Sequence, residues 1–373
     1  MLTVDSPKEI FLRILRGEEI SSSSLNDNQI QDLIDFSLKN NIALYVLDHL
    51  RTSNDKREGV LESYNKINKL YTLRYLSQKR TIYDISEIFN LHNIKYSFLK
   101  GVPLSLCAYK VPKLRFMRDL DILVRKQDLI KVVNIFLDRG YKSSINKNYN
   151  KMTYFNFDYS HQAPGLVSPD NIQIDIHHRV TTDLNTECKL SSDILENSID
   201  QYMDERAIKV PKQKHLYLHL CSHGLSNFSG GAIFFLDLFE LLKISEKNAF
   251  SFEIEELNKY GMIKEVEVAK GIVEKNLFTK EGIRNEDLGL FSLIIDSYEL
   301  SSRSTERLKK VNYFFLESLK FFLGHRPTLL DLKNILIFIG LKSKDYLKFL
   351  FKYTLNLRFN IQRLALIRDT TRK

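Results

Sequence analysis

Asp119 and Asp121 stand one residue apart in residues 118–124, a run that otherwise alternates and is rich in Leu, Ile and Val, as buried strands are. Residues two apart on a strand share a face, so both carboxylates point the same way, while Leu120 and Ile122 point into the core. Two half-buried carboxylates on one face repel each other and cost free energy unless a cation compensates them. Hard oxygen ligands at this spacing suit Mg²⁺ or Mn²⁺, so this segment predicts a divalent metal site.

A third carboxylate falls in another alternating run, residues 172–178. Gln173, Asp175 and His177 lie on one face of this predicted strand, and isoleucines lie on the other. An aspartate at the centre of so apolar a strand needs a compensating partner. We expect Asp175 to pair across the sheet with the other two aspartates and to complete the metal site.

The chain just before the aspartate pair has the features of an anion site. Residues 98–105, "FLKGVPLS", read as a strand end, then Lys100 and Gly101, then a helix start with Pro103 in its first turn. Gly101 permits close backbone approach, and the N–H groups of the helix N-terminus together with Lys100 form an anion site. A phosphate site about eighteen residues before an Asp-x-Asp metal site suggests a nucleoside triphosphate held through metal.

These motifs together resemble a known family. A strand–Gly–helix unit, then Asp-x-Asp, then a lone Asp on a later strand is similar to the polymerase-β-type nucleotidyltransferase superfamily. More closely, "FLKG…R…DLDILV…GY…IDIHHRV" resembles the uncharacterised nucleotidyltransferase family, which carries Leu-Lys-Gly, Arg-x-x-x-Asp-Leu-Asp and an acidic–x–His strand. The later "LYLHLCSHG…FFLDLFELL" and "GHRPTLLDLKNIL" also resemble it. The resemblance covers most of residues 70–350, and its specific part is residues 98–125 and 172–179.

The resemblance implies transfer of a nucleoside monophosphate, AMP by default, from a nucleoside triphosphate to a hydroxyl of a small-molecule or peptide-derived acceptor, with release of pyrophosphate. It implies two Mg²⁺ or Mn²⁺ ions. Asp119, Asp121 and Asp175 are the expected metal ligands and catalytic residues. Asp175 would also help to take the proton of the acceptor.

Basic side chains would then neutralise the phosphates. Arg115 is preferred over Arg118 because it matches the family's arginine. The superfamily usually has Gly-Ser or Gly-Gly where this chain has Gly101 and Val102, so a hydroxyl that touches phosphate would have to come from Ser105. The expected nucleotide-binding residues are Lys100, Gly101, Ser105, Arg115, Arg118 and His177.

Several histidines are further candidates. His177 reads equally well as an ordinary strand-end residue or as a contact to phosphate, metal or acceptor, and His161 is a loop residue that could approach the site. His215, His219 and His223 recur every four residues on one helix face, a spacing that can bind Zn²⁺. The leucines between them favour a packed helix that lines the cleft opposite the sheet. Asp237 lies in an apolar helix, where we expect it to pair with one of these histidines rather than act as a base on the acceptor.

The charge distribution leaves other functions open. The formal charge is +9, and from His325 to the end eleven Lys and Arg stand against three Asp and Glu. This basic segment, residues 325–373, suits solvated helix faces, an anionic membrane surface or RNA. One alternative is therefore an acceptor that is RNA or protein, as in tRNA-modifying or toxin-like members of the superfamily. A second is a non-catalytic nucleotide-binding scaffold.

The elements that carry these residues predict an α+β fold. Residues 1–90 carry helical spacing, with Asn26 or Asp27 as a helix cap, and residues 91–185 form a nucleotidyltransferase core with a small mixed sheet of at least three strands. Residues 186–373 are expected to be a large helical domain that ends in the basic tail.

The remaining composition favours a cytoplasmic protein. Three scattered cysteines, Cys107, Cys188 and Cys221, form neither a disulfide framework nor a metal-binding spacing, which fits a reducing compartment. The start of the chain does not read as a signal peptide, and no apolar run is long enough to cross a bilayer.

Overall fold

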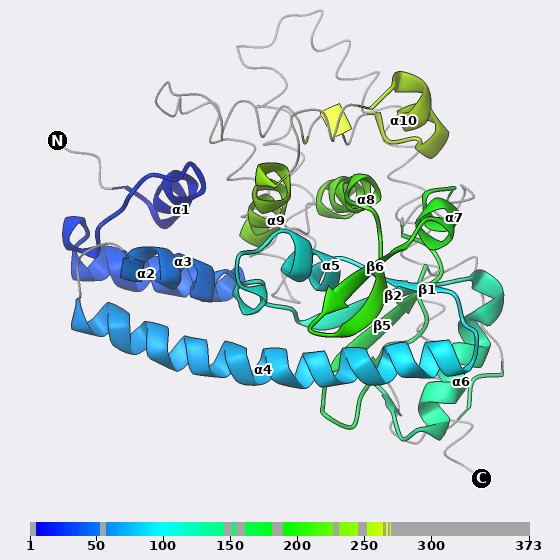
Figure 1. Ribbon diagram of the computed structural model, residues 1–373. Helices are drawn as coiled ribbons and strands as arrows, with labels where there is room; N and C mark the ends of the chain where they lie inside the picture. The colour runs from blue at the N-terminus through cyan, green and yellow to red at the C-terminus, as the bar shows by residue number, and fades with distance from the viewer. Residues whose placement is uncertain are drawn as a thin grey trace, which may run out of the picture. The chain divides into compact units, whose positions relative to one another are not determined.

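The computed structural model describes residues 5–52, 57–144, 151–153, 161–180, 189–226, 231–244, 252–263, 266–267 and 269 (Figure 1). All of them lie in the first of two compact units, Met1–Arg307. This unit combines helices with a small mixed sheet, so the predicted α+β class is confirmed. No helix among the described residues is long and apolar enough to cross a membrane. The basic segment 325–373 lies outside the described residues.

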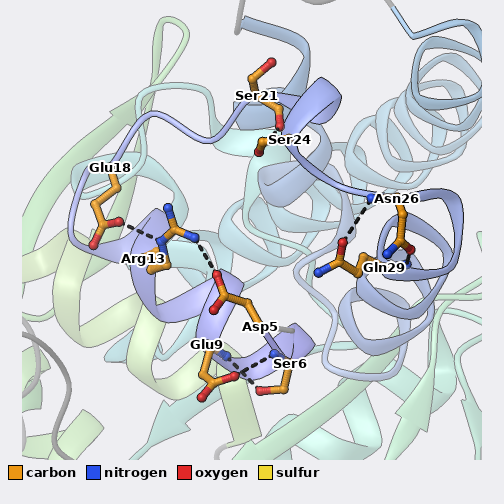
Figure 2. A network of polar contacts seen from close by, with 9 residues as sticks. All are labelled: Asp5, Ser6, Glu9, Arg13, Glu18, Ser21, Ser24, Asn26 and Gln29. Carbon is orange, nitrogen blue, oxygen red and sulfur yellow. Dashed lines mark hydrogen bonds and ion pairs between the residues drawn. The ribbon is translucent and has the colours of Figure 1, made fainter. Parts of the chain in front are cut away.

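The chain begins with four helices, α1 (Pro7–Leu15), α2 (Asp27–Lys39), α3 (Ala43–Thr52) and α4 (Glu58–Leu91), with a short 3₁₀ turn, η1 (Ser22–Ser24), between the first two. Figure 2 shows how polar side chains fix the ends of α1 and α2. Asn26 is the cap of α2: its Oδ1 accepts from the Gln29 backbone N–H at 2.9 Å, and the Gln29 side chain accepts from the Asn26 N–H at 3.0 Å. Such a reciprocal capping box satisfies two otherwise unpaired donors.

Helix α4 is one continuous helix of 34 residues. Its first half contributes Val60 and Tyr71 to the core cluster of the N-terminal helices. Its second half contributes Ile82, Ile85 and Phe89 to the core beneath the sheet. Because one rigid helix serves both clusters, the described N-terminal helices pack continuously with the sheet.

The sheet has the order β1-β2-β5-β4-β3. Strands β2 and β5 pair in parallel, and the other neighbours pair antiparallel, so the sheet is mixed. Its strands are β1 (Tyr96–Phe98), β2 (Asp119–Val124), β3 (Lys142–Ser143), β4 (Leu166–Val167) and β5 (Gln173–His177). The helical segments around it are α5 (Gly101–Cys107), η2 (Pro112–Leu114), η3 (Lys126–Asp128), α6 (Leu129–Asp138) and α7 (Lys189–Glu196).

The two faces of β2 belong to different cores. Ile122 packs in the cluster that contains Ile85 of α4. Leu123 packs in the cluster that contains Leu218 of the next helical layer. Because alternate residues share a face, Asp119 and Asp121 lie on the same face as Leu123, away from α4.

The prediction that residues 186–373 are helical was wrong in one place. Residues Ile199–Met203 and Arg206–Val210 form an antiparallel hairpin, β6 and β7. Asp204 takes a positive φ of 51° in its tight two-residue turn, a conformation that Asp tolerates better than most residues. Met203, Ile208 and Val210 are buried in the core cluster of the main sheet, so the hairpin packs with the α/β core.

Three helices follow the hairpin: α8 (Gln213–Ser226), α9 (Gly231–Lys243) and α10 (Ile254–Tyr260). Figure 1 shows α8 and α9 on the side of the sheet opposite α4. At Gly224 of α8, an added Cβ would lie 2.2 Å from the ring of Phe234 on α9, so only glycine permits this close helix contact. The face of β2 that carries the aspartates is therefore the face that α8 and α9 cover.

Candidate functional site

The parallel pairing of β2 and β5 brings the three aspartates together. Asp121 is the register partner of Asp175, and Asp119 is the partner of Gln173. Residues directly opposite in neighbouring strands project from the same side of a sheet. The predicted pairing of the two aspartate-bearing strands is confirmed, and we call Asp119, Asp121 and Asp175 the carboxylate face.

Asp121 is the most enclosed member of the carboxylate face, with 3% of its surface exposed. Its Oδ1 accepts from Lys100 Nζ at 2.6 Å and lies 2.7 Å from His177 Nε2. Burial by itself would raise the pKa of Asp121, but the Lys100 ammonium and His177 outweigh it and hold that pKa well below its usual range. Asp121 is therefore the ionised centre of the cluster.

Asp119 is compensated less completely. Burial, followed by the neighbouring charge of Asp121, raises the pKa of Asp119 to about 6, although Lys100 and Arg115 oppose the shift. The ammonium of Lys100 acts on all three carboxylates at once. The carboxylate face is therefore only partly neutralised by the described cations around it.

Asp175 completes the face from β5 and is half-buried. Gln162 Nε2 lies 3.4 Å from its Oδ2, and Gln173 Nε2 lies 3.4 Å from its Oδ1, both long contacts. An added Cβ on Gly165 would come within 3.0 Å of Oδ1, so the loop approaches this carboxylate closely. Sequence reasoning missed Gln162, whose only signal was its place beside His161.

Lys100 reaches Asp121 from a strained backbone. Its φ is 50° and its ψ is −111°, a region that L-residues rarely adopt and that costs on the order of 1–3 kcal/mol. Its neighbour Leu99 donates its N–H to the Asp121 carbonyl at 2.9 Å, which ties this turn to β2. The ammonium is therefore held beside the carboxylate by the backbone as well as by charge.

Packing gives a reason for Gly101 that the sequence did not suggest. An added Cβ would lie 2.6 Å from Cγ of the buried Met117, so the space that glycine leaves is filled by a side chain of the protein. The helix that starts at Gly101 has only seven residues, which limits its dipole. The geometry gives Gly101 a packing role, and its close approach to phosphate stays a prediction.

Ser105 is the residue expected to supply the hydroxyl missing at position 102. Ser105 is fully buried, and its hydroxyl donates to the Val102 carbonyl at 2.8 Å. In this structure the hydroxyl is therefore bonded within its own helix, and its contact with phosphate stays a prediction.

Arg115, the preferred phosphate ligand, is instead a partner of Asp237. Its Nε donates to Asp237 Oδ1 at 2.6 Å and its Nη2 to Oδ2 at 2.8 Å, while the Tyr109 hydroxyl donates to Oδ1 at 2.7 Å. The prediction that Asp237 pairs with a histidine was therefore wrong, because this bidentate arginine satisfies the carboxylate. Arg118, the second arginine considered, is exposed and lies 3.2 Å from Asn41 Oδ1 through its Nε.

Two of the three α8 histidines lie within electrostatic reach of the carboxylate face. Burial, then the charge of Lys100, lowers the pKa of His223 to about 3, and burial sets the pKa of His219 well below its ordinary value. Asp121 acts on both groups. His215 differs from them: burial lowers its pKa, and the largest charge effect on it comes from Asp193, outside the carboxylate face.

His161, a loop residue that the sequence suggested could approach the site, lies beside His177. Its ring centre lies 5.3 Å from that of His177, and burial, followed by His177 and Lys100, lowers its pKa to about 3. Neutral imidazoles from α8 and from this loop thus lie within electrostatic reach of the ionised Asp121 or its neighbours Lys100 and His177.

The donor chemistry of the carboxylate face fits a divalent cation, although the side chains are not arranged as a closed cage. Among the described residues, no group of three or more His, Cys, Asp or Glu side chains is positioned to hold a metal ion. This applies equally to the α8 histidines, so the Zn²⁺ alternative has no support there. The fit of the aspartates rests on their hard oxygen atoms and on the raised pKa of Asp119, which a nearby cation would reverse.

Comparison with known proteins adds one finding. A family model described as "Uncharacterised nucleotidyltransferase" matches residues 26–274, more than half of the chain. The match begins at the cap of α2 and includes every described strand. The segment 324–336, which also resembled this family, lies beyond it. No curated protein matches the chain significantly.

Proposed function

Because the chain belongs to the uncharacterised nucleotidyltransferase family, we propose that it moves a nucleoside monophosphate from a nucleoside triphosphate to a hydroxyl of a small-molecule or peptide-derived acceptor. Family membership supports nucleotidyl transfer as the general reaction. ATP is the default donor because it is the most abundant. The metal, the donor and the acceptor class are parts of the proposal.

The register of β2 against β5 is the observation that carries it. Asp121 and Asp175 face each other on adjacent strands, with Asp119 two residues before Asp121. A buried surplus of carboxylates is costly unless a ligand compensates it. A metal-bound triphosphate is such a ligand.

In the proposed reaction the acceptor oxygen forms a bond to the α-phosphorus, and the bond to the β-phosphate oxygen breaks, so pyrophosphate leaves. The carboxylate face would hold Mg²⁺ or Mn²⁺, which when bound neutralises phosphate charge and makes an acceptor hydroxyl more acidic. Asp175 accepts the proton of that hydroxyl. Lys100 and Arg118 contact phosphate oxygens, and His177 keeps Asp121 oriented through its hydrogen bond.

The acceptor would approach from the side of α8. His161, His219 and His223 are neutral there, and a neutral imidazole can both donate and accept a hydrogen bond. Such groups suit a hydroxyl-bearing acceptor.

Calorimetry with ATP, GTP, CTP and UTP, each with Mg²⁺ or Mn²⁺, tests the proposal. We expect metal-dependent binding of at least one nucleotide, lost in Asp119→Asn/Asp121→Asn. Asp200→Asn is the matched control, because Asp200 lies on a strand but pairs at the surface with Lys209. Equal binding by the double variant would contradict the role of the carboxylate face.

The alternatives give different results in the same series. Salt-dependent RNA binding that requires residues 325–373 would favour an RNA acceptor. Nucleotide binding without turnover across a broad acceptor screen would favour a scaffold.

A further inference from the structure

We propose that Lys100 is an internal counter-ion that keeps divalent metal off the carboxylate face until a nucleoside triphosphate draws the ammonium away. Metal and nucleotide would then bind together, and the metal alone would bind weakly. This inference rests on the proposed function and concerns how the same site is regulated.

The first support is the contact itself. Lys100 Nζ lies 2.6 Å from Asp121 Oδ1, within the distance of a charge-assisted hydrogen bond. His177 Nε2 is 2.7 Å from the same oxygen. The most enclosed carboxylate therefore already has a cation, and an incoming metal must displace that cation or bind against its repulsion.

The second support is the backbone of Lys100. Glycine would adopt a φ of 50° without strain, yet the chain places a lysine there. Strain of this kind persists where the surroundings determine the conformation, and it clusters at switch regions. Here the adjoining Leu99 N–H is bonded to the Asp121 carbonyl, and Gly101 is packed against Met117. The turn is therefore built to present the ammonium to Asp121.

The third support is the charge balance. Lys100 acts on all three carboxylates, and Arg115, which also acts on Asp119, is already paired with Asp237. A divalent ion therefore remains attractive to the site once Lys100 has another partner. Phosphate oxygens are strong acceptors for an ammonium. A metal-bound triphosphate supplies both the cation for the carboxylates and the new partner for Lys100. Free metal supplies only the cation, and metal-free triphosphate supplies only the partner.

The test measures Mn²⁺ alone by electron paramagnetic resonance and Mn²⁺ with ATP by calorimetry, on the full chain. We expect Lys100→Gln to bind Mn²⁺ alone at least about tenfold more tightly than the wild type, because a repelling charge is gone. The same variant should bind metal-free ATP more weakly. Lys100→Arg keeps the charge and should resemble the wild type with Mn²⁺ alone.

Two further variants keep the result interpretable. Lys100→Gly removes the ammonium and the backbone strain together, so it should fold at least as well and show the same gain for Mn²⁺. Lys95→Gln is the control, because Lys95 pairs with Glu196 outside the carboxylate face.

Unchanged or weaker Mn²⁺ binding by both Lys100→Gln and Lys100→Gly would overturn the inference while leaving the proposed function intact. Failure of the wild type to bind any nucleotide with metal, alongside a gain for Mn²⁺ in both variants, would overturn the proposed function instead.

Discussion

Two ion pairs of this protein differ in how completely their charges are balanced. Arg115 and Asp237 match one positive with one negative charge through two hydrogen bonds, and the Tyr109 hydroxyl donates a third hydrogen bond to the carboxylate. Asp121 lies about as deep as Asp237, but Lys100 is more exposed than Arg115, and Asp119 and Asp175 add two carboxylates beside Asp121. The first pair is balanced, and the second belongs to a cluster in which carboxylates outnumber the lysine that contacts them.

Burial of charge therefore does not by itself mark a functional site. Asp237 is 2% exposed and Asp121 is 3% exposed, so depth does not separate them. What separates them is whether the protein supplies enough partners. A self-sufficient pair stabilises contacts between elements, whereas an unbalanced cluster retains a cost that a ligand can relieve.

The largest expected effect breaks the balanced pair. Asp237→Asn leaves the Arg115 guanidinium buried with a neutral partner and should lower the free energy of unfolding by about 3–5 kcal/mol. Urea denaturation followed by circular dichroism measures it. The double variant Arg115→Met/Asp237→Leu should recover most of the loss, because an apolar pair needs no partner. If the double variant does not regain stability, the pair must do more than neutralise its own two charges.

The next effect concerns the unbalanced cluster. Asp119→Asn removes one of the repelling carboxylates and should leave stability at pH 8 unchanged or higher. Metal-dependent nucleotide affinity should fall at least about a hundredfold, since loss of an outer partner alone costs 10–100-fold. Calorimetry and urea denaturation on the same sample compare the two. A marked loss of stability with unchanged nucleotide affinity would indicate that Asp119, like Asp237, has a structural role.

A smaller effect distinguishes packing from phosphate binding at Gly101. Gly101→Ala puts a methyl group 2.6 Å from Met117 Cγ and should destabilise the fold by about 1–3 kcal/mol. Adding Met117→Ala makes room for the methyl group. If the double variant regains the apparent melting temperature lost in Gly101→Ala, packing explains the glycine. Reduced ATP affinity with full stability would indicate phosphate contact instead.

The smallest effect is a pH dependence. The pKa of Asp119 is raised from 3.8 to about 6, so the folded state holds this proton more tightly than the unfolded chain. Asp119 therefore contributes stability that is fully present below pH 3.8 and is lost as the pH rises through 6. The unfolding free energy of the wild type minus that of Asp119→Asn should fall between pH 4 and pH 7.

The comparison with Asp119→Asn is necessary because buried histidines change the pH dependence of stability in the opposite direction. The lowered pKa values of His161 and His223, about 3, add stability as the pH rises toward 6.5. Both proteins share those histidines, so their contribution cancels in the difference. A difference that stays flat from pH 4 to pH 7 would contradict the raised pKa of Asp119.

The sequence by itself determined the local features of this protein. Alternation in residues 118–124 and 172–178 specified which face of each strand carries its aspartates, because side chains on a strand alternate with a period of two. The cap at Asn26 was also readable from the sequence, since a capping box lies within a few neighbouring residues.

Only the tertiary structure decided which charges meet. Arg115 pairs with Asp237 across 122 residues, where the sequence had predicted a histidine partner for Asp237. The packing of Gly101 against the side chain of Met117 likewise came only from the tertiary structure. Periodicity specifies the face of an element, but partners are chosen by the packing of elements that are distant in sequence.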